Sequence, residues 1–256
     1  MIDLVAVAHG TADPRGIRVV HDLVRMMARQ RPGVPMSLGF VDVDVPALPS
    51  LVRRVVADSN QAVVVPLLLS SGYHVSTDVG AEVDRYPGRV RAAAALGPDP
   101  LLVDILVDRL GDLGRIDHVV LAAAGSSDRR ALQDCSETAG LLADRINRPV
   151  DVGYISGAGE RLPSVLSRAP GRVAIATYLL APGFFETLIH RQAPGYPITP
   201  PLAPDPRLAT LALRRYDSVA ASLPVTWNGT SAERIQVGPI TWQRRLPRPS
   251  AVPTNG

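Results

Sequence analysis

An internal duplication is the feature that most constrains the fold of this chain. Residues 4–13 read LVAVAHGTAD and residues 119–128 read VVLAAAGSSD, so both segments consist of an apolar run, a glycine, a hydroxyl residue and an aspartate. His9 of the first copy corresponds to Ala124 of the second. Each copy is much longer than the roughly 20–50 residues of common solenoid repeats. The duplication therefore predicts two homologous lobes of which only the first has kept this histidine.

Three further pairs of segments follow in the same order in both copies. These pairs are 39–50 with 153–164, 63–74 with 173–185, and 97–100 with 203–206. The second histidine is also lost, because Tyr73-His74 corresponds to Phe184-Phe185. The spacing between copies shrinks from 115 residues at the first pair to 106 at the last, as small loop deletions would produce. We expect an N-terminal lobe at 1–114, a degenerate lobe at 115–218 and a Pro/Arg-rich, partly disordered extension at 219–256.

The hydrophobic pattern predicts an α/β fold for each lobe. Short apolar runs, typical of buried parallel strands, alternate with segments of helical periodicity. In the first lobe we expect strands at 4–8, 35–41, 63–69 and 90–96, and helices at 15–31, from Pro46 onward, and at 103–110. Each lobe is thus predicted to be a small open parallel sheet flanked by helices. In such sheets ligands bind in a cleft at the carboxyl ends of the strands.

Three residues with useful chemistry follow three different predicted strands. His9, Asp42 and His74 each lie at or beyond the carboxyl end of a strand. Because the carboxyl ends of parallel strands share one edge of a sheet, we expect these side chains to meet in one cleft. The sequence therefore predicts a single functional site, in the first lobe.

Composition excludes several classes of protein. The 256 residues are 46% hydrophobic and 20% charged, and no apolar run reaches the roughly 20 residues of a membrane span. The first residues lack the basic segment of a secretory signal, so we expect a cytoplasmic protein without a membrane partner. The net charge of +3 is scattered, which gives no support for nucleic-acid binding.

The basic residues and the single cysteine narrow the chemistry further. All 27 basic residues are arginine, so a Schiff-base lysine and a Walker lysine are both excluded. Cys135 is the only cysteine, so an internal disulfide and a thiolate cluster are excluded as well. We expect it to be a buried small hydrophobe or an indifferent thiol. Anionic substrates would have to be bound by guanidinium groups, which suit carboxylates.

The two histidine motifs resemble those of a known family. HGTADPRG at 9–16 and VVVPLLLSSGYHVSTD at 63–78, taken together, are similar to the paired motifs of the sirohydrochlorin chelatases. These enzymes insert Fe2+ or Co2+ into a reduced tetrapyrrole without ATP. The resemblance covers both copies and matches the long, two-lobe form of the family. It implies that His9 and His74 bind the metal, and that Asp42 takes the place of the family's usual glutamate, with Asp44 as an alternative.

The residues themselves agree with this chemistry. Metal insertion needs a site that holds a divalent ion with an incomplete ligand shell, so that pyrrole nitrogens can take the open positions. Two pyrrole protons must also leave, and a neutral imidazole is a suitable acceptor near pH 7. The sequence does not decide which histidine is the ligand and which the base. We expect no permanently bound cofactor, since the divalent metal is a substrate.

The substrate would be a ring with many carboxylates, which requires polar donors around the cleft. The expected substrate-binding residues are Thr11, Arg15, Ser70, Ser71, Tyr73 and Thr77. Glycines 10 and 72 would let the backbone approach the ligand closely, and Tyr73 would stack on the ring. The expected partners are therefore a tetrapyrrole and a divalent metal, in a monomer that contains its own pseudo-dimer.

Several alternatives stay open at this point. A histidine phosphatase also has a strand ending in His-Gly, but it needs an arginine before the histidine, where this chain has Ala8. A carrier that binds metal or tetrapyrrole without turnover would fit the same pattern, as would a coproporphyrin ferrochelatase. The choice between iron and cobalt, and hence between the sirohaem and cobalamin branches, is also open.

Overall fold

The computed structural model describes residues 2–42, 44–58, 60–72 and 74–223, with the backbone alone for residues 74–76. The elements of the first copy are β1 (Ile2–Ala8), α1 (Pro14–Gln30), β2 (Met36–Phe40), α2 (Leu48–Ala57), β3 (Gln61–Pro66), the π-helix η1 (His74–Val79), α3 (Gly80–Val83), β4 (Val90–Ala92) and α4 (Pro100–Leu110). Those of the second copy are β5 (His118–Ala123), α5 (Arg129–Ile146), β6 (Val150–Tyr154), α6 (Leu162–Arg168), β7 (Val173–Tyr178), α7 (Phe184–Gln192) and α8 (Pro206–Ala220).

The strands form two parallel sheets with matching order. The first sheet has the order β2-β1-β3-β4 and the second β6-β5-β7. Their registers also match, since Val7 pairs with Pro66 in the first sheet and Ala122 pairs with Thr177 in the second. A single parallel bridge between Ile175 and Ile198 stands where the first sheet has β4. The predicted fold class, two α/β lobes with parallel sheets, is confirmed.

Each central strand is apolar throughout because both of its faces are covered. Leu4, Ala6 and Ala8 of β1 face one hydrophobic core, whereas Val5 and Val7 face another. This alternation follows from the two-residue period of a strand. Strands buried on both faces therefore read as continuous apolar runs, which is the pattern seen in the sequence.

Four helices begin at an aspartate that accepts a hydrogen bond from a backbone N–H of the first turn. These caps are Asp13 of α1, Asp99 of α4, Asp128 of α5 and Asp205 of α8, with oxygen–nitrogen distances of 2.8–3.0 Å. An N-cap carboxylate satisfies a donor that the helix itself leaves unpaired. The caps form two equivalent pairs, one in each copy, so the duplication is preserved in the way the helices start.

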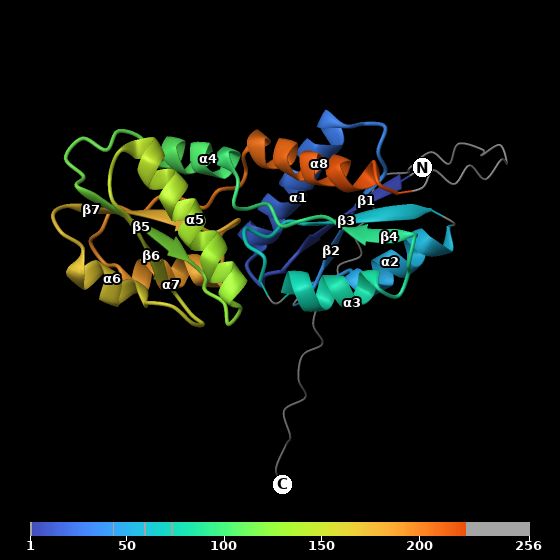
Figure 1. Cartoon of the computed structure of the whole chain (residues 1–256), viewed down its shortest axis with the longest axis horizontal. Helices are drawn as coiled ribbons and strands as arrows, with labels where there is room; N and C mark the ends of the chain where they lie inside the picture. Colours follow the sequence, from blue (N-terminus) through green and yellow to red (C-terminus); the bar gives the residue numbers. More distant parts are fainter. Residues whose placement is uncertain (1, 43, 59, 73, 224–256) are drawn as a thin grey trace, which may run out of the picture. The chain divides into compact units, whose positions relative to one another are not determined.

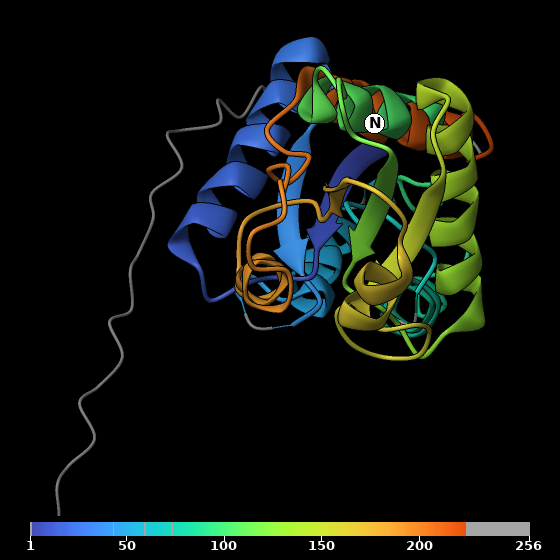
Figure 2. The ribbon, with the colours of Figure 1, turned by 90° about the vertical axis from the view of Figure 1, so that its left-hand side faces the viewer.

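The last helix of each copy packs against the other copy. Helix α4 contacts β7 and α5, and helix α8 contacts β3 and α1. Figures 1 and 2 both show α4 and α8 side by side, and the two helices are in contact. One large core, which includes residues of β1, β3, β5 and β7, lies beneath these helices. Smaller cores cover the opposite faces, with α2 on the first sheet and α6 on the second.

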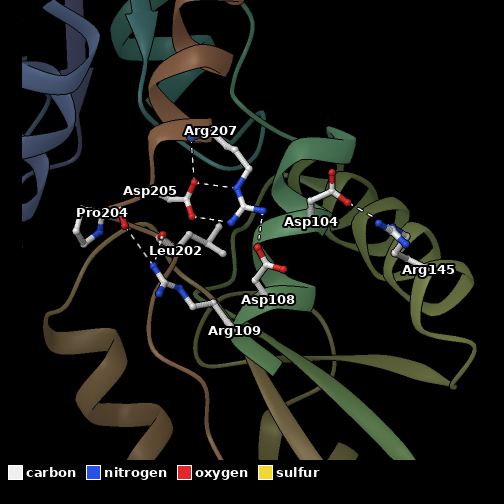
Figure 3. Close-up of polar contacts among 8 residues, drawn as sticks. All are labelled: Asp104, Asp108, Arg109, Arg145, Leu202, Pro204, Asp205 and Arg207. Carbon is white, nitrogen blue, oxygen red and sulfur yellow. Dashed lines mark hydrogen bonds and ion pairs between the residues drawn. The ribbon is translucent and has the colours of Figure 1, made fainter. Parts of the chain in front are cut away.

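Polar contacts join the end of α4 to the start of α8 (Figure 3). The Arg207 guanidinium donates to the Asp205 carboxylate at 2.8 and 2.9 Å, and its other Nη lies 2.6 Å from Asp108 of α4. Arg109 of α4 donates to the carbonyl oxygens of Leu202 and Pro204 at 3.2 and 3.3 Å. The two copies are thus connected by planar guanidinium groups as well as by apolar packing.

The described residues belong to one compact unit. The expected boundary between residues 114 and 115 stays a prediction about where the first copy of the duplicated sequence ends. Helix α8 continues to Ala220, which is two residues into the expected extension, and residues 224–256 lie outside the described part. Among the described residues, no helix is both long and apolar enough to cross a membrane.

Candidate active site

A cavity of about 810 Å³ lies at the carboxyl ends of the central strands of both sheets. Its wall from the first copy comes from the turn after β1, the start of α1, Phe40 and the segment after β3. Its wall from the second copy comes from the turn after β5, α5, Tyr154 and residues 178–185. The cavity is therefore built by both copies, at the strand edge where the sequence predicted a cleft.

The turn that presents His9 depends on the glycine after it. Gly10 has a φ of +96°, and a Cβ at this position would meet the carbonyl oxygen of Asp42. The Asp42 N–H donates to the His9 carbonyl at 3.1 Å. Only glycine combines a positive φ with such a close backbone approach at little cost. The turn therefore fixes His9 at the cavity wall.

The second copy repeats this turn without the histidine. Gly125 has a φ of +94°, and the Ser156 N–H donates to the Ala124 carbonyl at 2.8 Å. Ala124, Gly125 and Ser126 line the same cavity. The backbone of the site has thus been kept in both copies, whereas the imidazole has been kept in one.

The predicted site residues do not all lie on the cavity wall. Half-buried His9, Thr11 and Ser70 line it, and Arg15, Asp42, Ser71 and Thr77 are not among the lining residues. Tyr73 lies outside the described residues. His74 is the first residue of η1, and its side chain lies outside the described part. The structure therefore brings together three of the predicted residues and leaves the convergence of His9, Asp42 and His74 a prediction.

The segment between β3 and His74 differs from the expected strand. β3 ends at Pro66 rather than continuing to Leu69. The Leu67 N–H still donates to the Val7 carbonyl at 2.7 Å, but β1 ends at Ala8 and the ladder with it goes no further. Leu67, Leu68, Leu69 and Ser70 form part of the cavity wall.

Asp42 and Asp44 follow β2 beside the His9 turn. The Asp42 side chain is exposed, and its backbone contacts His9 as described above. Asp44 is half-buried, and its Oδ1 accepts a hydrogen bond from the Val45 N–H at 2.8 Å. Neither residue lines the cavity. The acidic role implied for Asp42 accordingly stays a proposal.

Arg15 lies on the first turn of α1, and its side chain is 64% exposed. Its guanidinium holds the Asp13 carboxylate at 2.8 Å and lies 3.6 Å from Glu186 of the second copy. The side-chain hydrogen bond from Arg15 lowers the pKa of Asp13 below its usual range. Arg130 and Asp128 repeat this pair at the start of α5. The exposed guanidinium groups of Arg15 and Arg130 therefore lie at equivalent positions in the two copies. Each is at the start of the helix that follows a strand whose end lines the cavity.

The second copy supplies cavity residues beyond the predicted substrate-binding set. Tyr154, Tyr178, Phe184, Phe185 and Cys135 all line the cavity. Phe184 is 68% exposed, and its ring contacts Phe185 edge-on with centroids 5.8 Å apart. An exposed phenylalanine in a cavity wall is a surface suited to a flat apolar ligand. The duplication indicates an aromatic residue at this place in the cavity, because Phe184 corresponds to Tyr73 of the first copy.

Cys135 is a poor metal ligand despite its place on the wall. The residue is 5% exposed, and burial raises the pKa of its thiol to about 12. A thiol binds metals as the thiolate, which is scarce at neutral pH when the pKa is so high. Within the described residues there is no group of three or more His, Cys, Asp or Glu that would hold a metal ion.

These features define a class of protein: a duplicated parallel α/β chain with one cavity shared by both copies and one histidine at its wall. The chain belongs to the CbiX family, whose model matches residues 3–113 and 118–219, one match for each copy.

Individual relatives agree with this assignment. The chain is 31% identical over 143 residues to the sirohydrochlorin ferrochelatase of Priestia megaterium, a match that covers 50% of this chain and 54% of that relative. It is 25% identical over 130 residues to the sirohydrochlorin cobaltochelatase of Methanothermobacter thermautotrophicus, covering 43% of this chain and 90% of the relative. The matched part thus spans about half the length of the ferrochelatase.

A solved structure shows that the fold extends over most of the chain. SirB from Bacillus subtilis with Fe3+ matches with a TM-score of 0.75 over 86% of this chain and 96% of that one, at 22% sequence identity. The likeness supports the two-lobe fold.

Proposed function

We propose that this protein is a sirohydrochlorin chelatase that inserts Fe2+ or Co2+ into the reduced tetrapyrrole. The observation that carries the proposal is the position of His9, which lies on the wall of a cavity formed by the strand ends of both copies. The cavity volume of about 810 Å³ falls within the range of small-molecule sites, roughly 300–1,000 Å³. The names of the relatives, one of them an iron and one a cobalt chelatase, support the same reaction.

The apolar walls suit the flat ring of the substrate. Leucines 67–69 of the first copy and Leu179, Leu180 and Phe184 of the second line the cavity. Such side chains would contact the ring faces, with exposed Phe184 packing against the macrocycle. Thr11, Ser70, Ser126 and Ser127 add hydroxyl donors at the wall. Exposed Arg15 would bind a peripheral carboxylate, and the proposed contacts from Ser71, Tyr73 and Thr77 would complete the rim.

The histidines would perform the chemistry. His9 and His74 would bind the incoming ion and leave coordination positions open for the pyrrole nitrogens. As the metal passes to the ring, two pyrrole protons leave: an imidazole that has released the ion would accept one of them, and Asp42, Asp44 or solvent would take the other. Asp42 or Asp44 would assist by orienting a histidine or taking a proton. The second copy, with Ala124 in place of His9, would contribute walls and no metal ligands.

Anaerobic absorbance spectroscopy with sirohydrochlorin and either Fe2+ or Co2+ tests the proposal. We expect metal-dependent turnover above the uncatalysed rate, and loss of about 100-fold or more in His9→Ala, as is typical when a general base or ligand is removed. His190→Ala is the matched control, because His190 is exposed on α7 and does not line the cavity. Binding of ring or metal by the wild type without turnover would refute the enzyme and favour the carrier.

A further inference from the structure

The second copy makes two hydrogen bonds to the segment that leads to His74. Tyr178, the last residue of β7, donates its hydroxyl proton to the Leu69 carbonyl at 2.9 Å. Asp134 of α5 accepts a hydrogen bond from the Ser71 N–H at 2.6 Å. Leu69 and Ser71 belong to the segment that follows β3. Leu67 and Leu68 still bond to the first copy, at Val7 and Leu96, whereas Leu69 and Ser71 bond to the second copy.

Tyr178 is buried and Asp134 is half-buried, and the buried Thr138 links the two. Tyr178 is 3% exposed and Thr138 is fully buried. The Thr138 hydroxyl lies 3.3 Å from the Tyr178 hydroxyl and donates to the Asp134 carbonyl at 2.9 Å. Burial raises the pKa of Tyr178, so its hydroxyl keeps the proton that it donates to Leu69. A buried hydroxyl that lost this acceptor would be left unsatisfied, which makes the contact specific.

The duplication shows that this network is a property of the second copy alone. The matched strand registers and the helix starts define which positions correspond. Three polar residues stand where the first copy has apolar ones: Asp134 corresponds to Val19, Thr138 to Leu23 and Tyr178 to Leu67. Hydrocarbon side chains cannot make these bonds. The first copy therefore offers no such bonds in return.

The receiving residues are also asymmetric. Ser71 corresponds to Pro182, which has no N–H to donate. Gly97 corresponds to Ala203, and a Cβ on Gly97 would collide with the Tyr178 hydroxyl and the Leu69 carbonyl. The second copy can therefore make these hydrogen bonds to the segment before His74 in the first copy. The corresponding residues of the first copy cannot make them to the second.

We propose that Tyr178 and Asp134 are positioning residues, which hold residues 69–71 and through them the start of η1 at His74 against the cavity. The inference rests on the proposed function, in which His74 binds the metal. A metal site works only if its ligands are held within about 0.5 Å of the productive geometry. The second copy, which lacks both motif histidines, would then help to position the metal-binding segment of the first copy.

Hydrogen–deuterium exchange of the intact protein tests the structural half of this proposal. Tyr178→Phe and Asp134→Ala should each increase exchange in residues 69–79, whereas Asp134→Asn should restore protection because its amide oxygen still accepts from Ser71. Tyr216→Phe is the matched control. Tyr216 is also buried and donates to a backbone carbonyl, that of Ile2 at 2.8 Å, and it does not line the cavity.

Equilibrium titration with Co2+ in the absence of tetrapyrrole tests the functional half. We expect Tyr178→Phe and Asp134→Ala to bind Co2+ about 10-fold more weakly than the Tyr216→Phe control, the scale of an outer-shell contact. Exchange and affinity equal to the control, or faster exchange with unchanged affinity, would overturn the proposal. A wild type that binds Co2+ but lacks turnover would refute the chelatase function without changing this comparison.

Discussion

Replacement of Asp99 tests how much the contact between α4 and α8, each of which packs against the other copy, contributes to the free energy of unfolding. Asp99 is 6% exposed, caps α4 through the Leu101 N–H at 3.0 Å, and accepts from Arg215 of α8 at 3.2 Å. Asp99→Ala should cost about 1 kcal/mol for the cap. Leaving Arg215 without its carboxylate should add about 1–2 kcal/mol. This is less than the roughly 3–5 kcal/mol of a fully buried broken pair, because Arg215 keeps the Ala95 and Leu96 carbonyls.

Urea unfolding measures this difference against a matched control. Asp128→Ala removes the same kind of cap from α5. The partner of Asp128, Arg130, is 63% exposed, so loss of this ion pair should add almost nothing to the cost in stability. We expect Asp99→Ala to lower the free energy of unfolding by about 2–3 kcal/mol and Asp128→Ala by about 1 kcal/mol. An Arg215→Met variant completes a double-mutant cycle with Asp99→Ala. Equal losses in the two alanine variants, or no coupling in the cycle, would refute the reasoning.

Three further predictions concern the cavity and the core. Phe184→Ala should raise the KM for the tetrapyrrole roughly 10-fold with little change in kcat, since it removes contact area from the ring; steady-state kinetics at saturating metal measures this. Cys135→Ser should retain turnover, because the thiol pKa of about 12 leaves no thiolate to bind metal; loss of activity beyond the loss of stability would contradict this. Burial raises the pKa of Asp3 to about 6, so above that pH the folded state carries a half-buried charge at a cost in stability. Between about pH 4 and pH 6 the folded state retains a proton that the unfolded state has lost, so stability from this group falls as pH rises. Asp3→Asn should therefore stabilise the protein at pH 7 by about 1 kcal/mol after allowance for screening, and this gain should vanish below pH 4 in urea titrations.

The sequence was sufficient to predict the sheets, because each central strand is covered on both faces and so appears as an apolar run. It was also sufficient to predict the cleft, since parallel strands place residues such as His9 at one edge. The end of β3 was placed too late, because Leu67, Leu68 and Leu69 are as apolar as a strand although they line a cavity. The hydrophobic pattern indicates which residues avoid water, and it does not distinguish residues of a buried strand from residues that line a cavity.

The packing of α4 and α8 against the opposite copy was not predictable from the hydrophobic pattern of either helix. Leu102, Val103, Ile105 and Leu106 show that α4 has a buried face, yet nothing in that pattern says which sheet covers it. The role of the second copy was missed for a different reason. Tyr178 and Asp134 look like ordinary strand and helix residues until they are compared with Leu67 and Val19 of the first copy.

We propose that one metal site, based on His9 and His74, serves the whole two-copy molecule. X-ray absorption fine structure of the Co2+-loaded protein, without tetrapyrrole, tests it most directly because imidazole ligands give recognisable scattering. We predict one bound Co2+ with two imidazoles in the wild type, one fewer imidazole in His9→Ala and in His74→Ala, and an unchanged spectrum in His190→Ala. A spectrum that keeps both imidazoles in either of the first two variants would contradict the account.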